Sequence, residues 1–393
     1  MAKKSQPHVF GRARPSQSGT YSLHTTPPRN THYRELPEPT GQPPFHLDLA
    51  TIIPSPQYKA IVQKKKLVLH MNGDMGGINY DVPQILVAKG MEADFDQAAT
   101  PENNPAFLYV VGDCVYFNGE IKDYYSQFYQ PYEFYPAPIF AIPGNHDGEN
   151  VEGDESLKGF VRNFCAAHPE KLPESGDCPR TAMTQPNVYW TLITPLVSFV
   201  GLYSNVPEGG EIRAPQTEWL TQQLKELPGN RPLIVTLHHP IYSADNYHSG
   251  STHMKKVLED AVAASGRHPD MVIAGHVHNY QRLTKTLDDN SQIPYLVTGA
   301  GGYHNLHSVI KVDGEAMVTP VIFNDKGNDP VTLEYYCDDH HGFLRMEITE
   351  QLITGKYYTV PRPQEPYSKP AKLVDYFEFD WQTKRYAPNT LGG

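Results

Sequence analysis

The stretch LVLHMNGDMGG, residues 67–77, decides the fold that the sequence predicts. Its apolar residues Leu67, Val68 and Leu69 are typical of a buried strand, and the strand runs directly into a glycine-rich turn that carries Asp74. An aspartate in such a turn is well placed to bind a metal ion, but an ion needs several more ligands. Either other parts of the chain supply them, or Asp74 is an ordinary turn residue.

The same arrangement recurs along the chain, where short apolar runs end in clusters of Gly, His, Asp or Asn. The further runs are AFLYVVGD at 106–113, PIFAIPGNHD at 138–147, PLIVTLHHP at 232–240 and DMVIAGHVH at 270–278. Between some of them, residues 214–227 and 251–265 carry apolar side chains at the spacing of an amphipathic helix. Strands that alternate with helices predict an α/β domain, in which ligands bind beyond the strand ends.

The polar ends of these runs together offer a set of metal ligands. They are Asp74, Asp113, Tyr116, Asn145, His146, Asp147, His238, His239, His276 and His278. One such cluster alone is typical of a polar turn, but five at the same structural position are not explained by five independent turns. Carboxylate, amide and imidazole groups suit hard to borderline metals. They are numerous enough for two ions about 3.5–4 Å apart that share one carboxylate.

Five motifs, in this order, resemble those of the calcineurin-like metallophosphoesterases: GDMG at 73–76, GDCVY at 112–116, GNHD at 144–147, VTLH at 235–238 and GHVH at 275–278. The first motif of that superfamily is usually Asp-x-His, and Gly76 stands where the His would be. The purple acid phosphatases share this difference and carry a tyrosine where this chain has Tyr116. The resemblance covers about residues 74–305. It implies an α/β fold, a four-layer α/β/β/α sandwich with mixed sheets.

The resemblance also implies which side chains hold the metals. A ferric ion, Fe(III), would be held by Asp74, Asp113, Tyr116 and His278. A second, divalent ion, which is Fe, Zn or Mn in this interpretation, would be held by Asp113, Asn145, His238 and His276. Asp113 would bridge the two ions. A nearby cation would keep the tyrosine deprotonated below its usual pKa of about 10.

The activity that the resemblance implies is the hydrolysis of phosphate monoesters by in-line attack of a metal-bound hydroxide. Asn145 and His146 are expected to contact the phosphate of a small phosphorylated substrate, and His146 is also expected to take part in catalysis. His248, ten residues after His238, is expected to contact the phosphate as well and to donate a proton to the leaving oxygen. A phosphodiesterase with the same site is one alternative, and a metal-binding module without catalysis is another.

The composition limits the partners of the chain. A net charge of −11 argues against nucleic acid as the default partner, and no apolar stretch is long enough to span a membrane. No apolar segment of a secretory signal follows the start, so we expect a cytoplasmic location. The 4 cysteines are too few for a disulfide framework, which favours free thiols over a bridge between Cys165 and Cys178. The oligomeric state is not indicated.

The distribution of Pro, Gly and Tyr suggests a division of the chain. Residues 1–60 are predicted to form an extended, Pro-rich arm and residues 61–350 the catalytic domain, with a long insertion at 149–190. Residues 351–393 are predicted to wrap around that domain. The polar sequence CDDHH at 337–341 looks like a metal motif, but a hairpin turn is the favoured interpretation.

Overall fold

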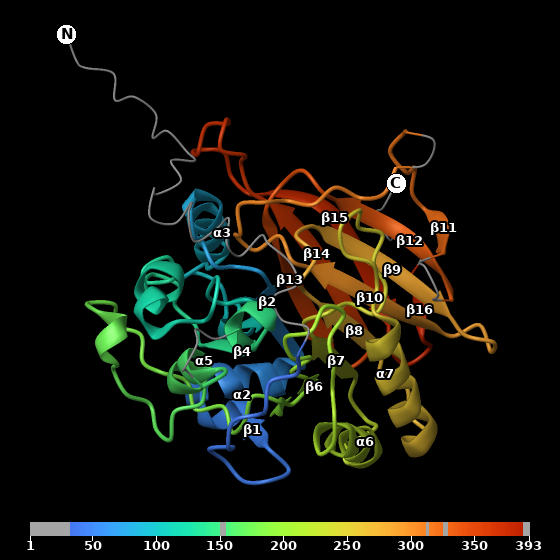
Figure 1. Cartoon of the computed structure of the whole chain (residues 1–393), viewed down its shortest axis with the longest axis horizontal. Helices are drawn as coiled ribbons and strands as arrows, with labels where there is room; N and C mark the ends of the chain where they lie inside the picture. Colours follow the sequence, from blue (N-terminus) through green and yellow to red (C-terminus); the bar gives the residue numbers. More distant parts are fainter. Residues whose placement is uncertain (1–31, 150–154, 312–313, 325–328, 388–393) are drawn as a thin grey trace.

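The computed structural model describes residues 32–149, 155–311, 314–324 and 329–387, and two mixed β-sheets form its centre (Figure 1). The nine-stranded sheet has the order β1 (His46–Asp48), β5 (Trp190–Ile193), β6 (Ser198–Gly201), β7 (Leu233–Leu237), β8 (Met271–Ala274), β10 (Gln292–Thr298), β9 (Tyr280–Thr286), β12 (Pro330–Cys337) and β11 (Val321–Asn324). The seven-stranded sheet has the order β16 (Arg385–Tyr386), β15 (Lys372–Asp380), β14 (Leu352–Thr359), β13 (Gly342–Thr349), β2 (Lys66–Asn72), β3 (Leu108–Val111) and β4 (Ile139–Ile142).

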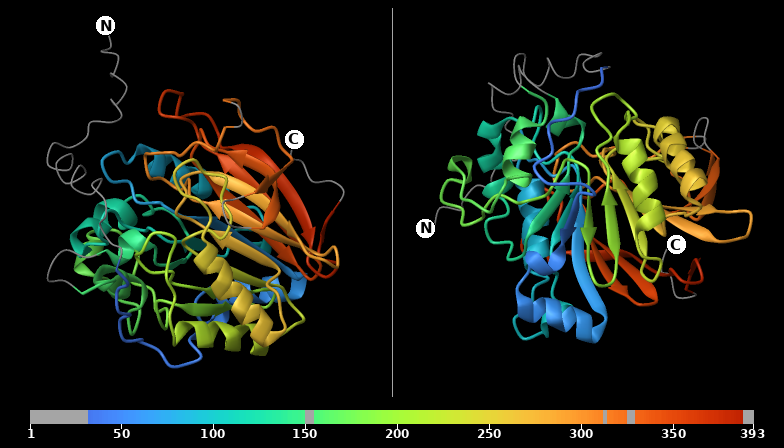
Figure 2. Two further views of the ribbon diagram at one scale, coloured as in Figure 1. Left: turned by 45° about the vertical axis from the view of Figure 1, so that its right-hand side comes forward. Right: turned by 90° about the horizontal axis from the view of Figure 1, so that it is seen from below.

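The longer helices pack on the outer faces of the two sheets (Figure 2). The helices are α2 (Ser55–Lys64), α3 (Val82–Glu92), α4 (Asn145–Gly148), α5 (Lys158–Phe164), α6 (Gln216–Glu226) and α7 (Thr252–Ser265). Helices α6 and α7 lie side by side next to the nine-stranded sheet, whereas α2 and α3 contact strands of the seven-stranded sheet. Each of the two predicted amphipathic helices buries its apolar face, as with Trp219, Leu220 and Leu224 of α6. The predicted four-layer α/β/β/α sandwich is therefore confirmed.

Polar groups as well as apolar side chains join the inner faces of the two sheets. The Tyr109 hydroxyl on β3 lies 3.0 Å from the Thr236 hydroxyl on β7. At a second place between the sheets, Arg282 on β9 donates two hydrogen bonds, of 2.8 and 2.9 Å, to the Asp375 carboxylate on β15. Both side chains of this ion pair are at most 2% exposed, so the pair lies inside the apolar core between the sheets.

Parallel strands in each sheet place their carboxyl ends at a common edge. In the seven-stranded sheet β2, β3 and β4 are parallel neighbours, and in the nine-stranded sheet β6, β7 and β8 are. The turns after β2, β3 and β4 therefore meet the turns after β7 and β8. This geometry puts all five predicted polar clusters in one region.

The ends of the described chain contribute more regular structure than the sequence suggested. Residues 46–48 of the predicted arm form β1, and α2 begins within the arm at Ser55 and ends beyond it at Lys64. The segment predicted to wrap the domain instead supplies β14, β15 and β16 to the seven-stranded sheet, a correction to that expectation. Buried residues of β14 alternate with half-exposed ones, which is the pattern of a strand with one face in the core. The Tyr and Lys residues of this segment make that pattern weak in the sequence.

Two smaller expectations have different outcomes. The hairpin turn predicted at 337–341 is wrong, because β12 pairs with β9 and β11 whereas β13 pairs with β2 and β14. The loop between β12 and β13 thus crosses from one sheet to the other. In the insertion at 149–190, Cys165 and Cys178 are buried free thiols, as the sequence favours.

Candidate metal centre

The backbone at the five strand ends is shaped to bring side chains close together. Asp74, Asp113 and His276 all have left-handed backbone conformations, with φ of 56°, 53° and 68°. Such conformations are costly for non-glycine residues and cluster at functional sites. Glycines beside these residues provide space: a Cβ at Gly144 would lie 2.1 Å from Asp113 Oδ1, and one at Gly299 would lie 2.7 Å from Asp74 Oδ2.

Three of the predicted ligands of the ferric ion surround one point. The Tyr116 hydroxyl lies 3.2 Å from Asp74 Oδ1 and 3.4 Å from His278 Nε2. The same His278 nitrogen lies 3.5 Å from Asp74 Oδ1. These side chains come from the turns after β2, β3 and β8, so both sheets contribute to this half of the site.

The predicted ligands of the divalent ion form a second group beside the first. Asn145 Oδ1 lies 3.0 Å from His238 Nε2 and 3.1 Å from His276 Nδ1. His238 Nε2 also lies 3.4 Å from Asp113 Oδ2 and 4.0 Å from Asp74 Oδ1, which links the two halves. Ligand atoms of Asp74, Asp113 and His238 all lie within 4.8 Å of one another, so the two groups of ligands adjoin at Asp113. The structure thus brings the seven predicted ligands together.

Hydrogen bonds to the backbone fix the orientation of two of the histidines. His238 Nδ1 lies 2.9 Å from the Val111 carbonyl, and His278 Nδ1 lies 2.8 Å from the Asn305 carbonyl. Because a carbonyl only accepts, each Nδ1–H donates and each Nε2 is turned toward the carboxylates. Histidine ligands of metal ions are held in this way in proteins, through a hydrogen bond at the other ring nitrogen.

Asp147 has a role that its motif did not reveal. Its carboxylate is buried and accepts hydrogen bonds of 2.9 to 3.1 Å from the backbone N–H groups of Gly144, Cys114 and Val115. It therefore ties the turn after β4 to the turn after β3, and it positions Asn145 relative to Asp113. Nothing in the sequence distinguishes such a turn-bracing carboxylate from a ligand.

The charges of the centre fit a cation. Burial raises the pKa of Asp74 to about 6. Burial also opposes ionisation of Asp113, but His238 and His146 outweigh it and hold the pKa of Asp113 well below its usual range. Burial would lower the pKa of His238, yet Asp113 raises it to about 9. Among the described residues neither carboxylate pairs with Lys or Arg. The protonated His238 is the cationic neighbour of both, and a bound metal ion would take over that charge compensation.

The protonation state of His278 also fits a bound cation. Burial holds its pKa well below the usual range, so the ring carries no charge. Its Nε2 lone pair then faces an oxygen of Asp74 and the hydroxyl of Tyr116. A nitrogen lone pair and a carboxylate oxygen turned toward each other repel unless a cation lies between them. The donor set accordingly fits metal binding.

Tyr116 occupies the space that a ligand at position 76 would need. A Cβ at Gly76 would lie 2.8 Å from the Tyr116 ring and 2.6 Å from Gln127 Oε1, so no histidine fits there. The Tyr116 ring also stacks on Tyr303 at a centroid distance of 4.2 Å. Burial raises the pKa of Tyr116 well above its usual value, so the phenol stays protonated unless a cation is bound next to it.

The predicted substrate residues lie at the more open rim of the centre. The side chains of His146 and His248 are 23% and 28% exposed, whereas those of Asp74 and Asp113 are at most 1% exposed. The His146 backbone N–H donates to Asp113 Oδ1 at 2.9 Å. The His248 ring lies 4.4 Å from that of His276, between centroids.

Two other histidines lie beside this rim. His307, which follows the glycine-rich turn at 299–302, has its ring 4.3 Å from that of His278. His239 directs Nδ1 away from the ligands, to the Ser204 hydroxyl at 2.8 Å. Burial lowers the pKa of His239 well below its usual value, so it is a neutral residue behind the site.

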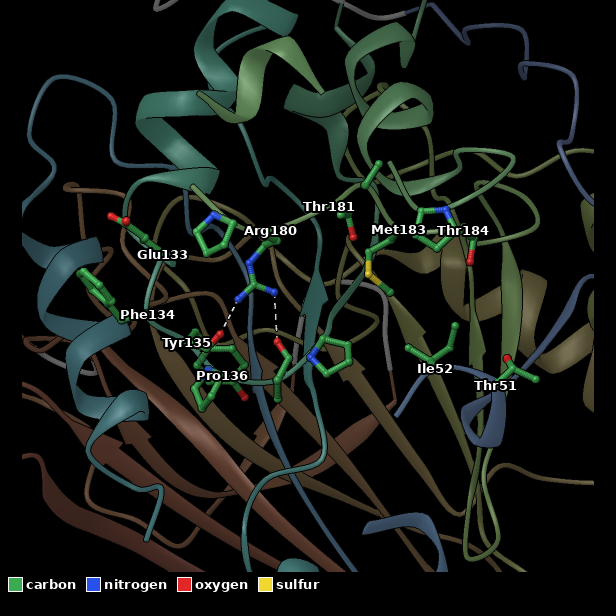
Figure 3. A pocket seen from close by; sticks show the side chains of 15 residues that line it. Thr51, Ile52, Glu133, Phe134, Tyr135, Pro136, Arg180, Thr181, Met183 and Thr184 are labelled. Carbon is green, nitrogen blue, oxygen red and sulfur yellow. Dashed lines mark hydrogen bonds between the residues drawn. The ribbon is translucent and has the colours of Figure 1, made fainter. Parts of the chain in front are cut away.

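A large cavity elsewhere on the protein is separate from this centre (Figure 3). It has a volume of about 530 Å³, and none of the predicted ligands lines it. Arg180 lies in it and donates to the carbonyls of Ala137 and Tyr135. Its guanidinium thus stabilises the turn before β4, which is a structural role.

Comparison with known protein families matches residues 68–280 to the calcineurin-like phosphoesterases, more than half of the chain. The chain belongs to the calcineurin-like phosphoesterase family. The matched region contains all seven predicted ligands, from Asp74 to His278. The family that the motifs predicted is therefore confirmed.

Within this phosphoesterase family, named relatives are purple acid phosphatases. The chain is 28% identical over 174 residues to Purple acid phosphatase 21 of Arabidopsis thaliana, covering 42% of this chain and 36% of that protein. It is 25% identical over 236 residues to Purple acid phosphatase 23 of the same plant, covering 51% of this chain and 47% of that protein. The alignments thus span less than half the length of these relatives.

A solved structure agrees with the family assignment at the level of the fold. The purple acid phosphatase from yellow lupin (Lupinus luteus) seeds superposes with a TM-score of 0.56 at 15% identity, covering 80% of this chain and 54% of that one. At this identity the likeness shows the phosphoesterase fold alone.

Proposed function

We propose that this chain is a binuclear metal-dependent phosphatase that hydrolyses phosphate monoesters. The ions would be Fe(III), held by Asp74, Asp113, Tyr116 and His278, and a divalent Fe, Zn or Mn, held by Asp113, Asn145, His238 and His276. The substrate would be a small phosphorylated molecule. A phosphodiesterase with the same centre is the second candidate, because the ligand set would serve both reactions.

One observation carries this proposal: seven side chains from five strand ends converge as two groups of ligands that share a buried region. The contacts of His238 Nε2 with Asn145, Asp113 and Asp74 join the two groups. Such an arrangement of hard and borderline donors is what two neighbouring ions require. The family membership and the purple acid phosphatase relatives support the same interpretation.

Two bound ions would supply charge neutralisation for a phosphoryl group and an activated water. The residues then have separate tasks. Asp74, Asp113 and ionised Tyr116 would contribute three negative charges against the five positive ones of the ions, which would leave the centre at about +2 and attractive to a phosphate. Asn145 and His146 would contact the phosphoryl oxygens. His248, at the open rim, would give the leaving oxygen a proton from Nε2 of its imidazolium form, because Nδ1–H faces Glu208.

The role of His248 leads to the prediction that His248→Ala binds metals normally but turns over slowly. For an alkyl phosphate, whose leaving group needs a proton, the loss in kcat should be about 10²–10⁴-fold. For an aryl phosphate with an acidic leaving group, the loss should be much smaller. Steady-state kinetics on the two substrates measures the difference; an equal loss on both would make His248 a binding residue.

Tyr116 leads to a spectroscopic prediction. A phenolate bound to Fe(III) absorbs visible light by charge transfer, so the iron-loaded protein should be coloured. Tyr116→Phe should bleach it and keep the fold, because the two side chains share a ring that is buried against Tyr303. One visible spectrum of each protein decides the matter. A colourless, iron-free and fully active enzyme would remove ferric iron from the proposal.

An assay with an aryl phosphate and the matching aryl diester tests the activity itself. A higher kcat/KM on the monoester supports the phosphatase, a higher value on the diester supports the second candidate, and no hydrolysis by metal-loaded protein contradicts both.

Among the described residues no helix is long and apolar enough to cross a membrane. The cytoplasmic location stays a prediction.

A further inference from the structure

A tight turn between β6 and α6 brings a carboxylate to the rim of the metal centre. Glu208 begins the sequence EGG, and both following glycines are left-handed, with φ of +76° at Gly209 and +77° at Gly210. The Gly210 N–H donates to the Pro207 carbonyl at 2.7 Å, which closes the turn. The Ser251 hydroxyl donates to the Gly209 carbonyl, so the turn is also tied to the start of α7.

The Glu208 carboxylate contacts the ring of His248. His248 Nδ1 lies 2.9 Å from Glu208 Oε1, and since a carboxylate only accepts, Nδ1–H is the donor. The same oxygen lies 3.4 Å from His276 Nε2. The backbone of His248 is fixed separately, because its N–H and that of Tyr247 donate to Asp245 Oδ2 at 2.9 and 3.0 Å. Asp245 thus fixes where the residue sits, and Glu208 fixes how its ring is turned.

We propose that Glu208 is a positioning residue, which holds the His248 ring so that Nε2 points toward the leaving oxygen of the substrate. The inference rests on the proposed phosphatase function. A histidine that donates from Nδ1 to a fixed carboxylate has one ring orientation and a defined tautomer. Without that bond the half-exposed ring would sample several rotamers, and few of them would reach the substrate.

The environment of Glu208 favours this role over that of a metal ligand. The Glu208 side chain is 70% exposed, whereas the carboxylates of Asp74 and Asp113 are at most 1% exposed. Its shorter contact is to His248 rather than to His276, by 2.9 against 3.4 Å. Ion binding by Glu208, His248 and His276 together is the competing outcome in the test.

The test compares Glu208→Ala with Glu208→Gln in the full, metal-loaded chain. Glu208→Ala should lower kcat on an alkyl phosphate by about 10- to 100-fold, the loss typical when the partner of a functional histidine is removed. Its kcat on an aryl phosphate with an acidic leaving group and its metal content should change little. Glu208→Gln keeps an oxygen that can accept from Nδ1–H, so it should recover most of the activity.

Two controls make the result specific. Glu211→Ala removes a carboxylate from the same loop that pairs with Arg213 instead, and it should behave as wild type. The double variant Glu208→Ala with His248→Ala should be no slower than His248→Ala alone, because one residue acts through the other. Additive losses, an equal loss on both substrates or no loss at all would overturn the inference, as would loss of metal from Glu208→Ala.

A readout without catalysis separates this inference from the proposed function. In metal-free protein labelled with ¹⁵N-histidine, the signal absent from His248→Ala identifies the His248 ring. At a pH above the pKa of that ring, the single proton should lie at Nδ1 in wild type, and Glu208→Ala should show a mixture of tautomers; the proton for the leaving oxygen is the second one, carried at Nε2 by the imidazolium form. If the wild type shows this tautomer but hydrolyses neither ester, the proposed function fails and the positioning contact stands. An unchanged tautomer in the Ala variant would overturn the positioning role.

Discussion

Asp113→Asn is expected to remove metal and activity together. Asp113 is the one carboxylate assigned to both ions, and its side chain is 1% exposed, so no solvent group can replace it. An amide of the same shape keeps the packing but loses the negative charge that two cations need. We expect a loss of about 10³-fold or more in kcat/KM, at least that of removing one electrostatic group from a catalytic site, together with reduced metal content.

The control for this variant is Asp260→Asn, which changes an exposed aspartate on α7 that pairs with Lys256. It should keep full metal content and activity. Metal content by mass spectrometry and kcat/KM on an aryl phosphate are measured on the same samples. Full occupancy with normal turnover in Asp113→Asn would show that this carboxylate does not bridge two ions.

The second large effect concerns stability and follows from the buried ion pair between Arg282 and Asp375. Asp375→Asn leaves Arg282 as a charge buried between the two sheets without its partner, and it also weakens the 2.8 Å hydrogen bond from the Tyr280 hydroxyl. Removing one member of a buried ion pair costs about 3–5 kcal/mol. The free energy of unfolding, measured in urea, should fall by about that amount.

Asp260→Asn again serves as the matched control, since its ion pair with Lys256 is exposed and worth about 0.5 kcal/mol or less. The double variant Arg282→Met with Asp375→Leu removes both charges and should recover most of the lost stability. If Asp375→Asn unfolds at the same urea concentration as Asp260→Asn, the pair does not join the sheets in the way described.

The sequence predicted the part of the fold in which apolar runs are short, continuous and followed by Gly, Asp or His. Strands β2, β3, β4, β7 and β8 have this form because both faces of a parallel strand are buried. The antiparallel strands β12 to β15 mix half-exposed Tyr, Lys and Glu with buried residues, so their pattern is weaker. For that reason the sequence predicts only a hairpin turn at 337–341 and a wrapping segment at 351–393 in this region.

The sequence likewise predicts some residues of the candidate site and misses others. Ligands such as Asp74 and His278 follow strands at fixed spacing, and the sequence shows both the residue and its position. Glu208 belongs to a loop whose path is set by Gly209 and Gly210, and no periodicity relates it to His248, forty residues later. Asp147 lies within a predicted motif, yet its bracing role appears only once the two turns are placed in space.

The metal content of the chain tests the central claim most directly. The protein is stripped with a chelator, reconstituted with iron and zinc, freed of loose ions and analysed by mass spectrometry. Two ions held by seven side chains predict about two metal ions per chain, one of them iron. One ion per chain, or none, would contradict a binuclear centre at the meeting point of the five strand ends.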